Sequence, residues 1–316
     1  MAGQAPNTGT GGDVPSWVPS AHLLLLTNMV FWATNAIVGK VAAEDGIEPV
    51  VLAILRWGIA ICLLLPFTWR VLWSYREDIW RRKGPLFLQG FLSVGCYNTL
   101  LYGALHNTTA INATLVGSTM PAITLLLAFL FVGETATPRK LAGMALTVIG
   151  VVLVISHGDL DVLLSLSFGR GELLMLIATL CWGGFSVSLR RWPPGLPPLA
   201  FLSVQTIGGL VVLIPLFIGG LAMGMTVPMT PNMLWIAPYV ALIPSIGAFI
   251  LWNQGVKMLG AGMASIYVNL IPVFTALLAV PLLGEQVAWY HLAGLMFCTS
   301  GVVLAAWSNR LGKPTG

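Results

Sequence analysis

Long apolar runs separated by short polar connections make up almost the whole chain. Breaking the sequence at its charged and turn-forming clusters leaves ten runs, each long enough for a helix that crosses a hydrocarbon core of about 30 Å. They lie near residues 22–42, 50–73, 86–105, 109–132, 139–156, 171–190, 198–219, 233–257, 261–283 and 289–309. The pattern predicts an all-α integral membrane protein with ten transmembrane helices, a disordered polar tail over 1–20 and a short tail over 310–316.

The composition supports this reading and excludes several other classes of protein. Of the 316 residues, 57% are apolar and 8% are charged, whereas a soluble domain carries about 25% charged residues. So few charges cannot solvate the surface of a globule, nor do they fit a disordered chain, a nucleic-acid binder or a disulfide-stapled secreted domain. The tail over 1–20 has no Lys or Arg, so it does not resemble a secretory signal, and we expect the first helix to be retained.

Basic residues predict the orientation of the helices. If the amino terminus is cytoplasmic, the cytoplasmic connections and the C-terminal tail hold twelve Lys and Arg residues, and the opposite side holds only Lys40 and Arg170. The twelve are Arg70, Arg76, Arg81, Arg82, Lys83, Arg139, Lys140, Arg190, Arg191, Lys257, Arg310 and Lys313. Because cytoplasmic loops carry an excess of Lys and Arg, we expect both termini to be cytoplasmic.

The chain also resembles itself at a shift of about 150 residues. At an offset of 151, Leu141-Ala142-Gly143 matches Leu292-Ala293-Gly294, Gly150 matches Gly301, Pro121 matches Pro272, and Gly133-Glu134 matches Gly284-Glu285. At offsets of 149 or 150, Pro49 matches Pro198, Pro66 matches Pro215, and Trp32 matches Trp182. Paired prolines, glycines and tryptophans in nearly constant register indicate an internal repeat, with one copy over 21–156 and the other over 171–309.

Each half contains five predicted spans, so the second half enters the membrane in the opposite sense to the first. Inverted repeats are typical of secondary transporters, in which the two halves enclose one site near the bilayer midplane. The symmetry therefore predicts a transporter that exposes a central cavity alternately to each side.

These features resemble the EamA family of the drug/metabolite transporter superfamily over essentially the whole chain. The likeness rests on the ten spans in two halves, a Pro in the fourth helix of each half, a Gly-Glu pair closing that helix, and the L-A-G…G-V-V-L fifth helix. Within the family, the chain is most similar to YddG-type inner-membrane exporters of aromatic amino acids. The resemblance implies a bacterial inner-membrane location and a basket of helices around a cavity, with the fifth and tenth helices at the periphery.

Polar and aromatic side chains inside the predicted spans are the candidates for a binding site, because polar groups are costly in hydrocarbon. The predicted substrate-binding residues are Trp32, Asn35, Arg56, Tyr97, Asn98, Tyr102, Asn112, Ser118, Trp182, Gln205, Trp252, Asn253, Tyr267 and Asn269. Any one polar side chain can instead serve only to bond a neighbouring helix, for about 0.6 kcal/mol. As a set, they suit a ligand with a flat apolar body and a small zwitterionic head, such as an aromatic or other neutral amino acid.

Several alternatives remain open from the sequence. A lipophilic organic cation bound by cation–π contacts would also suit aromatic walls, and a channel or a membrane scaffold is a rival of another class. No nucleophile or metal motif appears in the spans, so we expect neither an enzyme nor a metal or cofactor. The expected partners are a small-molecule substrate and the lipid bilayer, but no nucleic acid, and the oligomeric state stays open.

Three further features bear on mechanism. Arg56 is the one charge well inside a span, and its repeat counterpart, Gln205, is neutral. Arg56 either snorkels outward or bonds helix carbonyls, with Glu285 or Glu48 as possible partners, or it attracts a substrate carboxylate. Pro121 and Pro272 are predicted mid-helix, where each would frame the cavity with a kink or act as a hinge. No Asp, Glu or His lies near a predicted helix centre, which favours facilitated transport over proton exchange.

Overall fold

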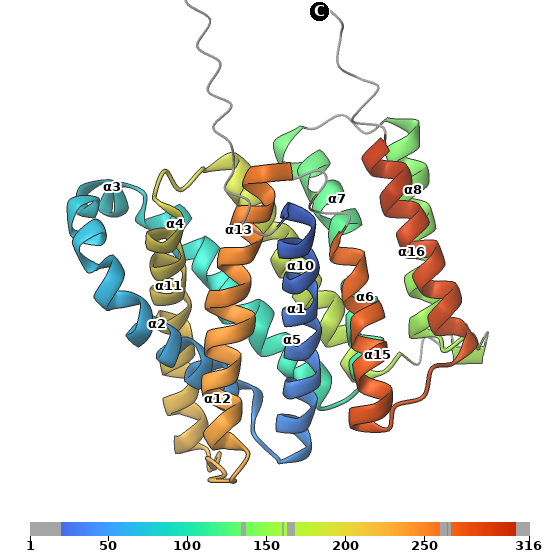
Figure 1. Ribbon diagram of the computed structural model, residues 1–316, viewed down its shortest axis with the longest axis horizontal. Helices are drawn as coiled ribbons and strands as arrows, with labels where there is room; N and C mark the ends of the chain where they lie inside the picture. Colours follow the sequence, from blue (N-terminus) through green and yellow to red (C-terminus); the bar gives the residue numbers. More distant parts are fainter. Residues whose placement is uncertain are drawn as a thin grey trace, which may run out of the picture.

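The computed structural model describes residues 20–133, 137–159, 161–162, 168–259, 264 and 267–307, and among these every regular element is a helix (Figure 1). The first half of the chain forms α1 (Ala21–Glu44), α2 (Pro49–Ser74), α3 (Arg76–Arg81), α4 (Lys83–Gly90), the π-helix η1 (Phe91–Tyr97), α5 (Asn98–Leu105), α6 (Ala110–Gly117), α7 (Met120–Val132) and α8 (Pro138–Ile155). The second half forms α10 (Arg170–Arg191), α11 (Pro198–Ala222), α12 (Met233–Ala241), the π-helix η2 (Leu242–Gly247), α13 (Ala248–Leu259), the 3-10 helix η3 (Val268–Leu270), α15 (Ile271–Leu283) and α16 (Trp289–Trp307).

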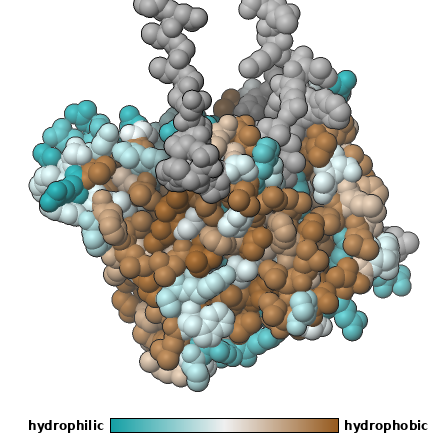
Figure 2. Space-filling model, in the orientation of Figure 1, coloured by the Kyte–Doolittle hydropathy of each residue, from teal (hydrophilic) through white to brown (hydrophobic). Residues whose placement is uncertain are grey.

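Each predicted span coincides with a helix or a series of helices over its described residues. Within the described part of the chain, six helical segments are long and apolar enough to cross a membrane, namely 21–44, 49–74, 110–132, 170–191, 198–222 and 233–259. Shorter apolar helices cover 141–155, 268–283 and 289–304. The remaining predicted span, 86–105, is helical but carries the polar side chains of Gln89, Ser93, Tyr97 and Asn98. Figure 2 shows a broad apolar surface across the middle of one face, with hydrophilic residues at the upper left, over α3, and along the lower edge.

Paired prolines and glycines of the two halves have the same tasks in the fold. Pro49 and Pro198 each begin a helix, α2 and α11, where the missing N–H of proline is not needed. Gly133 and Gly284 end α7 and α15 with φ angles of +74° and +67°, a left-handed conformation that glycine adopts without steric cost. The paired prolines and glycines in the sequence thus mark equivalent helix boundaries in the two halves. Glu134, predicted to close its helix, lies outside the described residues.

The positions of Pro121 and Pro272 correct the sequence prediction. We expected both in the middle of continuous helices, yet each lies in the first turn of a helix, α7 or α15. Because the proline ring clashes with the carbonyl four residues before it, the preceding helix ends instead of bending smoothly. In the fourth span α6 accordingly stops at Gly117, and α7 begins at Met120.

Helices α8 and α16 lie side by side at one edge of the molecule, on the right in Figure 1. A methyl group on Gly301 would overlap the carbonyl oxygen of Gly143, and one on Gly150 would come within 2.8 Å of the carbonyl oxygen of Gly294. Between these two contacts, Cys298 Sγ lies 3.7 Å from the carbonyl oxygen of Thr147. From one contact to the next, residue numbers rise along α8 and fall along α16, so the two helices are antiparallel. Glycine at these positions allows their close approach.

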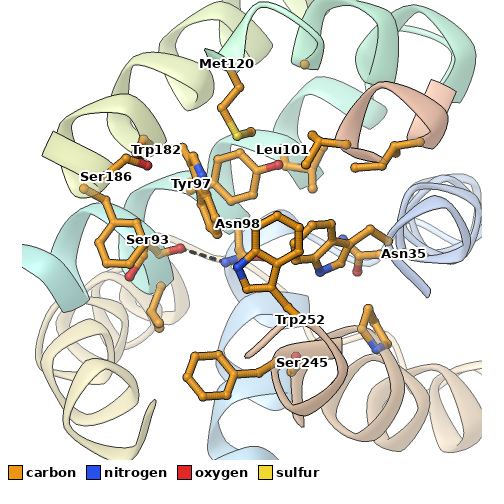
Figure 3. Close-up of a pocket in the computed structure, with 18 of the residues that line it drawn as sticks. Asn35, Ser93, Tyr97, Asn98, Leu101, Met120, Trp182, Ser186, Ser245 and Trp252 are labelled. Atoms are coloured by element: carbon orange, nitrogen blue, oxygen red, sulfur yellow. Dashed lines mark hydrogen bonds between the residues drawn. The ribbon is translucent and has the colours of Figure 1, made fainter. Parts of the chain in front are cut away.

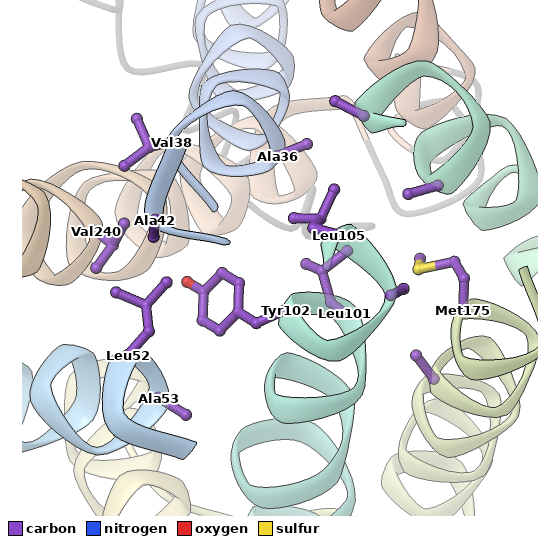
Figure 4. Packing of buried hydrophobic residues seen from close by; sticks show 14 of the residues in the cluster. Ala36, Val38, Ala42, Leu52, Ala53, Leu101, Tyr102, Leu105, Met175 and Val240 are labelled. Atoms are coloured by element: carbon purple, nitrogen blue, oxygen red, sulfur yellow. The ribbon is translucent and has the colours of Figure 1, made fainter. Parts of the chain in front are cut away.

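The end of the bundle that lies away from the termini is densely packed. Figure 1 shows the start of α1 and the end of α16 at the upper edge, which we call the terminal face, and the α1–α2 turn at the lower edge. Near this turn, Ala42, Leu52 and Leu105 surround Tyr102, and each is at most 1% exposed (Figure 4). Lys40 Nζ donates hydrogen bonds to the carbonyl oxygens of Leu105 and Thr108, both at 3.0 Å. The face opposite the terminal face is therefore closed by a dense core.

Candidate functional site

A cavity of about 380 Å³ lies between the two halves of the chain. Its wall is formed by residues of both halves. The first half contributes α1, α2, η1, α5, α6 and the start of α7, and the second contributes α10, α11, η2, α13, η3 and α15. The volume falls within the range of about 300–1,000 Å³ that is typical of small-molecule sites. Neither half could enclose this space without the other.

Aromatic rings form two opposing parts of the wall. Trp32 on α1 packs against Trp252 on α13, with ring centroids 5.3 Å apart, and Trp182 on α10 packs against Tyr97 on η1 at 4.9 Å. Figure 3 shows Trp182 and Tyr97 together on one side of the pocket and Trp252 and Ser245 on the other. Flat apolar ligands suit such walls, because ring stacking adds to the free energy of burial.

Arg56 is the most polar residue of the wall, and only 4% of its surface is exposed. Nε donates to the hydroxyl of Ser245 at 2.6 Å, and Nη1 donates to Asn35 Oδ1 at 2.9 Å and to the hydroxyl of Tyr102 at 2.7 Å. Nη2 donates to the carbonyl oxygen of Pro244 at 3.2 Å. All four partners are neutral, so the guanidinium is held in place without an opposite charge.

The counterpart of Arg56 makes an equivalent contact on the other side. Gln205 Nε2 donates to the hydroxyl of Ser93 at 3.1 Å. Ser93 and Ser245 are 152 residues apart in the sequence, one in each π-helix. Each serine donates its own proton to a carbonyl of the preceding turn, of Gln89 at 2.6 Å for Ser93 and of Val240 at 2.7 Å for Ser245. Both hydroxyls are thereby oriented to accept a hydrogen bond from the opposite half.

The structure brings most of the predicted site residues to one cavity. Ten of the 14 line it, and these are Trp32, Asn35, Arg56, Tyr97, Asn98, Ser118, Trp182, Gln205, Trp252 and Asn253. The other four, Tyr102, Asn112, Tyr267 and Asn269, are not part of the wall. Tyr102 is fully buried behind Asn35 and Arg56, and its hydroxyl donates to Asn35 Oδ1 at 3.0 Å. Tyr267 is hydrogen-bonded through its hydroxyl to His22 Nδ1.

Asn112 belongs to a separate polar cluster near the start of α6. Its Oδ1 accepts from His291 Nε2 at 2.8 Å, and its Nδ2 lies 3.4 Å from a carboxylate oxygen of Glu172. The same Glu172 oxygen accepts a hydrogen bond from the hydroxyl of Thr108 and lies 3.9 Å from His157 Nε2. This cluster joins the first half to α10 and α16 outside the cavity, so the prediction that Asn112 lines the cavity is wrong.

Glu285 also differs from its predicted role. It does not contact Arg56. Instead, its carboxylate oxygens accept hydrogen bonds from the backbone N–H groups of Ala110, with an N–O distance of 2.6 Å, and of Ile111, at 3.0 Å. These are free N–H groups of the first turn of α6, where a negative charge is favourable. Glu285 therefore caps a helix of the opposite half.

Sequence reasoning missed several residues of the wall. Ser93, Ser245, Pro244 and Phe249 contribute to it, as does Trp57, whose buried indole N–H has no hydrogen-bond partner among the described residues. Serine is common in membrane helices and single serines carry little signal. Gly95 and Gly247 are 152 residues apart, and the same offset relates Ser93 to Ser245. This repeat offset is the signal in the sequence that identifies the two serines. In the described part of the chain, no group of three His, Cys, Asp or Glu side chains is arranged to hold a metal ion.

Comparison with known proteins agrees with this architecture. The model of the EamA-like transporter family matches the chain twice, over 19–156 and 169–307. The chain belongs to this family. It is a multi-pass membrane transporter, and its two family segments correspond to the two halves that enclose the cavity.

Relatives of this EamA-like transporter occur in bacteria and archaea. An uncharacterized transporter of Archaeoglobus fulgidus is 30% identical over 291 residues, which cover 90% of this chain and 96% of the relative. The uncharacterized transporter YyaM of Bacillus subtilis is 26% identical, covering 82% and 84%, and protein PecM of Dickeya dadantii is 24% identical, covering 72% and 73%. One crystal structure, at 19% sequence identity, has a similar fold with a TM-score of 0.63, covering 94% of this chain and 99% of its own.

Proposed function

We propose that this protein carries small amphipathic metabolites, above all aromatic and other neutral amino acids, across a bacterial inner membrane by alternating access. The observation that carries the proposal is the cavity between the two halves, with aromatic walls and, beside Arg56, neutral amide and hydroxyl groups. Such a wall suits a ligand with a flat apolar body and a small polar head.

The proposed mechanism depends on the two halves being inverted copies related by a two-fold axis, with ten crossings in all. Such an axis exchanges equivalent residues, so that each contact between the halves occurs twice. The contact of Gly143 with Gly301 has its equivalent in that of Gly150 with Gly294. Thr147 and Cys298, which are 151 residues apart, contact each other, as expected of a pair on the axis.

Two contacts at the cavity support the same symmetry. The hydrogen bond from Arg56 to Ser245 has its equivalent in the bond from Gln205 to Ser93. The tryptophan of the first helix in each half packs, tilted, against an aromatic ring from the third helix of the other half. Antiparallel α8 and α16 agree with an inverted second half, because each is the last helix of its own half.

Alternating access requires that the closed end opens while the other end closes. The dense packing around Tyr102 supports a state in which the cavity is shut off from the face opposite the termini. We place the termini in the cytoplasm, which makes this a cytoplasm-facing state. Transport then follows the substrate gradient without proton exchange.

The proposed hinges are Pro121 and Pro272, each of which lies where a helix restarts. Unchanged transport rates in both Pro121→Ala and Pro272→Ala would rule out this role.

Counterflow in liposomes tests the proposed function. Vesicles loaded with unlabelled phenylalanine should accumulate labelled phenylalanine from outside, and a panel of the twenty amino acids should compete in order of their aromatic or neutral apolar character. A channel would equilibrate the label without overshoot, and a scaffold would show no uptake. Inhibition by organic cations but by no amino acid would favour the alternative, an exporter of lipophilic cations.

A further inference from the structure

We infer that Arg56 forms a subsite for a carboxylate, so that the cavity takes organic monocarboxylates with one flat apolar body, whether or not they also carry an amino group. This inference rests on the proposed transport function and names the chemical class of its substrates. It also separates the two substrate classes that aromatic walls alone would accept, acids and cations.

The charge of Arg56 has no opposite charge beside it. Among the described residues, the cavity wall contains no Asp or Glu, and no carboxylate lies within 4.0 Å of the guanidinium. A buried cation without an opposite charge is costly, because neutral hydrogen bonds replace only part of the hydration it has lost. A ligand that brings a carboxylate would supply the missing charge.

The hydrogen bonds of Arg56 orient the guanidinium and leave part of it unused. A guanidinium has five N–H groups, and four of them serve Ser245, Asn35, Tyr102 and Pro244. One N–H of Nη2 is left without a partner among the described residues, and so is the indole N–H of the adjacent Trp57. These two N–H groups beside the cavity lack acceptors in the described part of the chain, and a ligand that supplies acceptors there would pair them.

The opposite half shows that the fold does not need the charge. At the equivalent position Gln205 makes the same kind of bond to a π-helix serine through a neutral amide. An arginine at one of two equivalent positions gives the cavity a positive end and a neutral end. Substrates should therefore bind with the acidic group toward Arg56 and the apolar body between the aromatic walls.

No group in the wall matches the ammonium of an amino acid. Acceptors for it are limited to neutral amides, hydroxyls and carbonyls such as those near Asn98 and Ser118, because the described wall has no acidic side chain. Removing the amino group should therefore cost little affinity, whereas removing the carboxylate should abolish binding. Repulsion by Arg56 disfavours cations as well.

Ligand binding to the purified protein tests the inference without depending on transport. The quenching of tryptophan fluorescence from Trp32, Trp182 and Trp252 is titrated with 3-phenylpropionate, phenylalanine and phenethylamine, which share the ring and differ in the charged groups. We expect 3-phenylpropionate to bind at least as tightly as phenylalanine, and phenethylamine to bind about tenfold more weakly or worse. Equal affinity of the amine and the acid would overturn the inference.

Three variants locate the effect at Arg56. Arg56→Gln should weaken 3-phenylpropionate by about tenfold or more and leave phenethylamine unchanged or tighter, while Arg56→Lys should retain part of the preference for the acid. The double variant Arg56→Gln/Gln205→Arg should regain acid binding, because it moves the charge to the equivalent position. Full affinity of Arg56→Gln for the acid, or no recovery in the folded double variant, would contradict the inference.

The two proposals can fail separately. Tight binding of the acid with no counterflow of any compound would leave the subsite standing and overturn transport of these substrates. Counterflow of phenylalanine that is unaffected in Arg56→Gln would leave the carrier standing and overturn the subsite. Should Arg56→Gln not fold, the comparison of the three ligands on the unaltered protein decides the question.

Discussion

Single residues at the end of α15 have distinct tasks that connect the two halves. Gly284 turns the chain with a left-handed φ of +67°, and the next residue, Glu285, reaches across to the start of α6. The two adjacent residues of this Gly-Glu pair thus act on different helices. The glycine ends one helix, and the glutamate caps another.

Removing this cap should destabilise the protein. Glu285→Ala leaves the N–H groups of Ala110 and Ile111 without their acceptor, and we expect a loss of about 1 kcal/mol in the free energy of unfolding. Glu285→Gln keeps an acceptor but loses the charge, so its loss should be smaller. Thermal unfolding in detergent measures both, with Glu77→Ala on the exposed helix α3 as a control. Equal melting temperatures for Glu285→Ala and the control would contradict the capping role.

Aromatic residues of the site could be predicted from the sequence, whereas its hydrogen-bond partners could not. Trp32 and Trp182 stand out because tryptophans recur at the repeat offset, and both line the cavity. Tyr102 and Asn112 share the same chemistry as the residues of the wall, but they face the core and a neighbouring polar cluster. Which face of a helix meets the cavity is decided by tertiary packing, and hydropathy in a membrane span does not record it.

At the scale of elements, a close approach of α4 to α11 holds the halves together near the cavity. A methyl group on Gly90 would lie 2.5 Å from the carbonyl oxygen of Gln205 and 3.0 Å from the Cα of Gly208. A methyl group on Gly58 in α2 would meet nothing within 4 Å. The two glycines are thus a matched pair, one tightly packed and one in open space.

Gly90→Ala should therefore lower stability, and Gly58→Ala should not. Because backbone atoms cannot yield as a side-chain tip does, we expect Gly90→Ala to cost about 1–3 kcal/mol. The methyl group of Gly58→Ala adds no clash and slightly favours the helix. Melting temperatures of the two variants in the same detergent provide the comparison. A similar shift in both would show that the predicted contact does not constrain the backbone.

Helix breaks were the least predictable feature at this scale. Apolar runs over 86–105 and 233–257 predict continuous helices, and the structure instead places the π-helices η1 and η2 within them. Since a span that is apolar all round has no periodic pattern to interrupt, hydropathy does not reveal a change in helical repeat. In the fourth span, Pro121 indicates the place of the break, but the sequence predicts a kink or hinge there, whereas in the structure a new helix begins.

At the scale of the whole molecule, the sequence repeat and the contacts between halves both support the proposed two-fold symmetry. Offsets of 149 to 152 residues relate the residues that meet twice across the cavity and at the α8–α16 pair. The two repeats of the family could be predicted because they depend on register along the chain. The dense packing around Tyr102 could not, because it depends on how the two nearly equal halves pack in one state.

Access to the cavity from both sides of the membrane tests the proposed carrier most directly. In a background with Cys62, Cys96, Cys181 and Cys298 replaced, Ser186→Cys places a thiol on the cavity wall, and Met229→Cys places one on the exposed α11–α12 connection as a control. A membrane-impermeant thiol reagent should label Ser186→Cys in vesicles of either orientation, more slowly when phenylalanine is present, and Met229→Cys in one orientation only. Labelling of Ser186→Cys from a single side, with or without phenylalanine, would contradict alternating access.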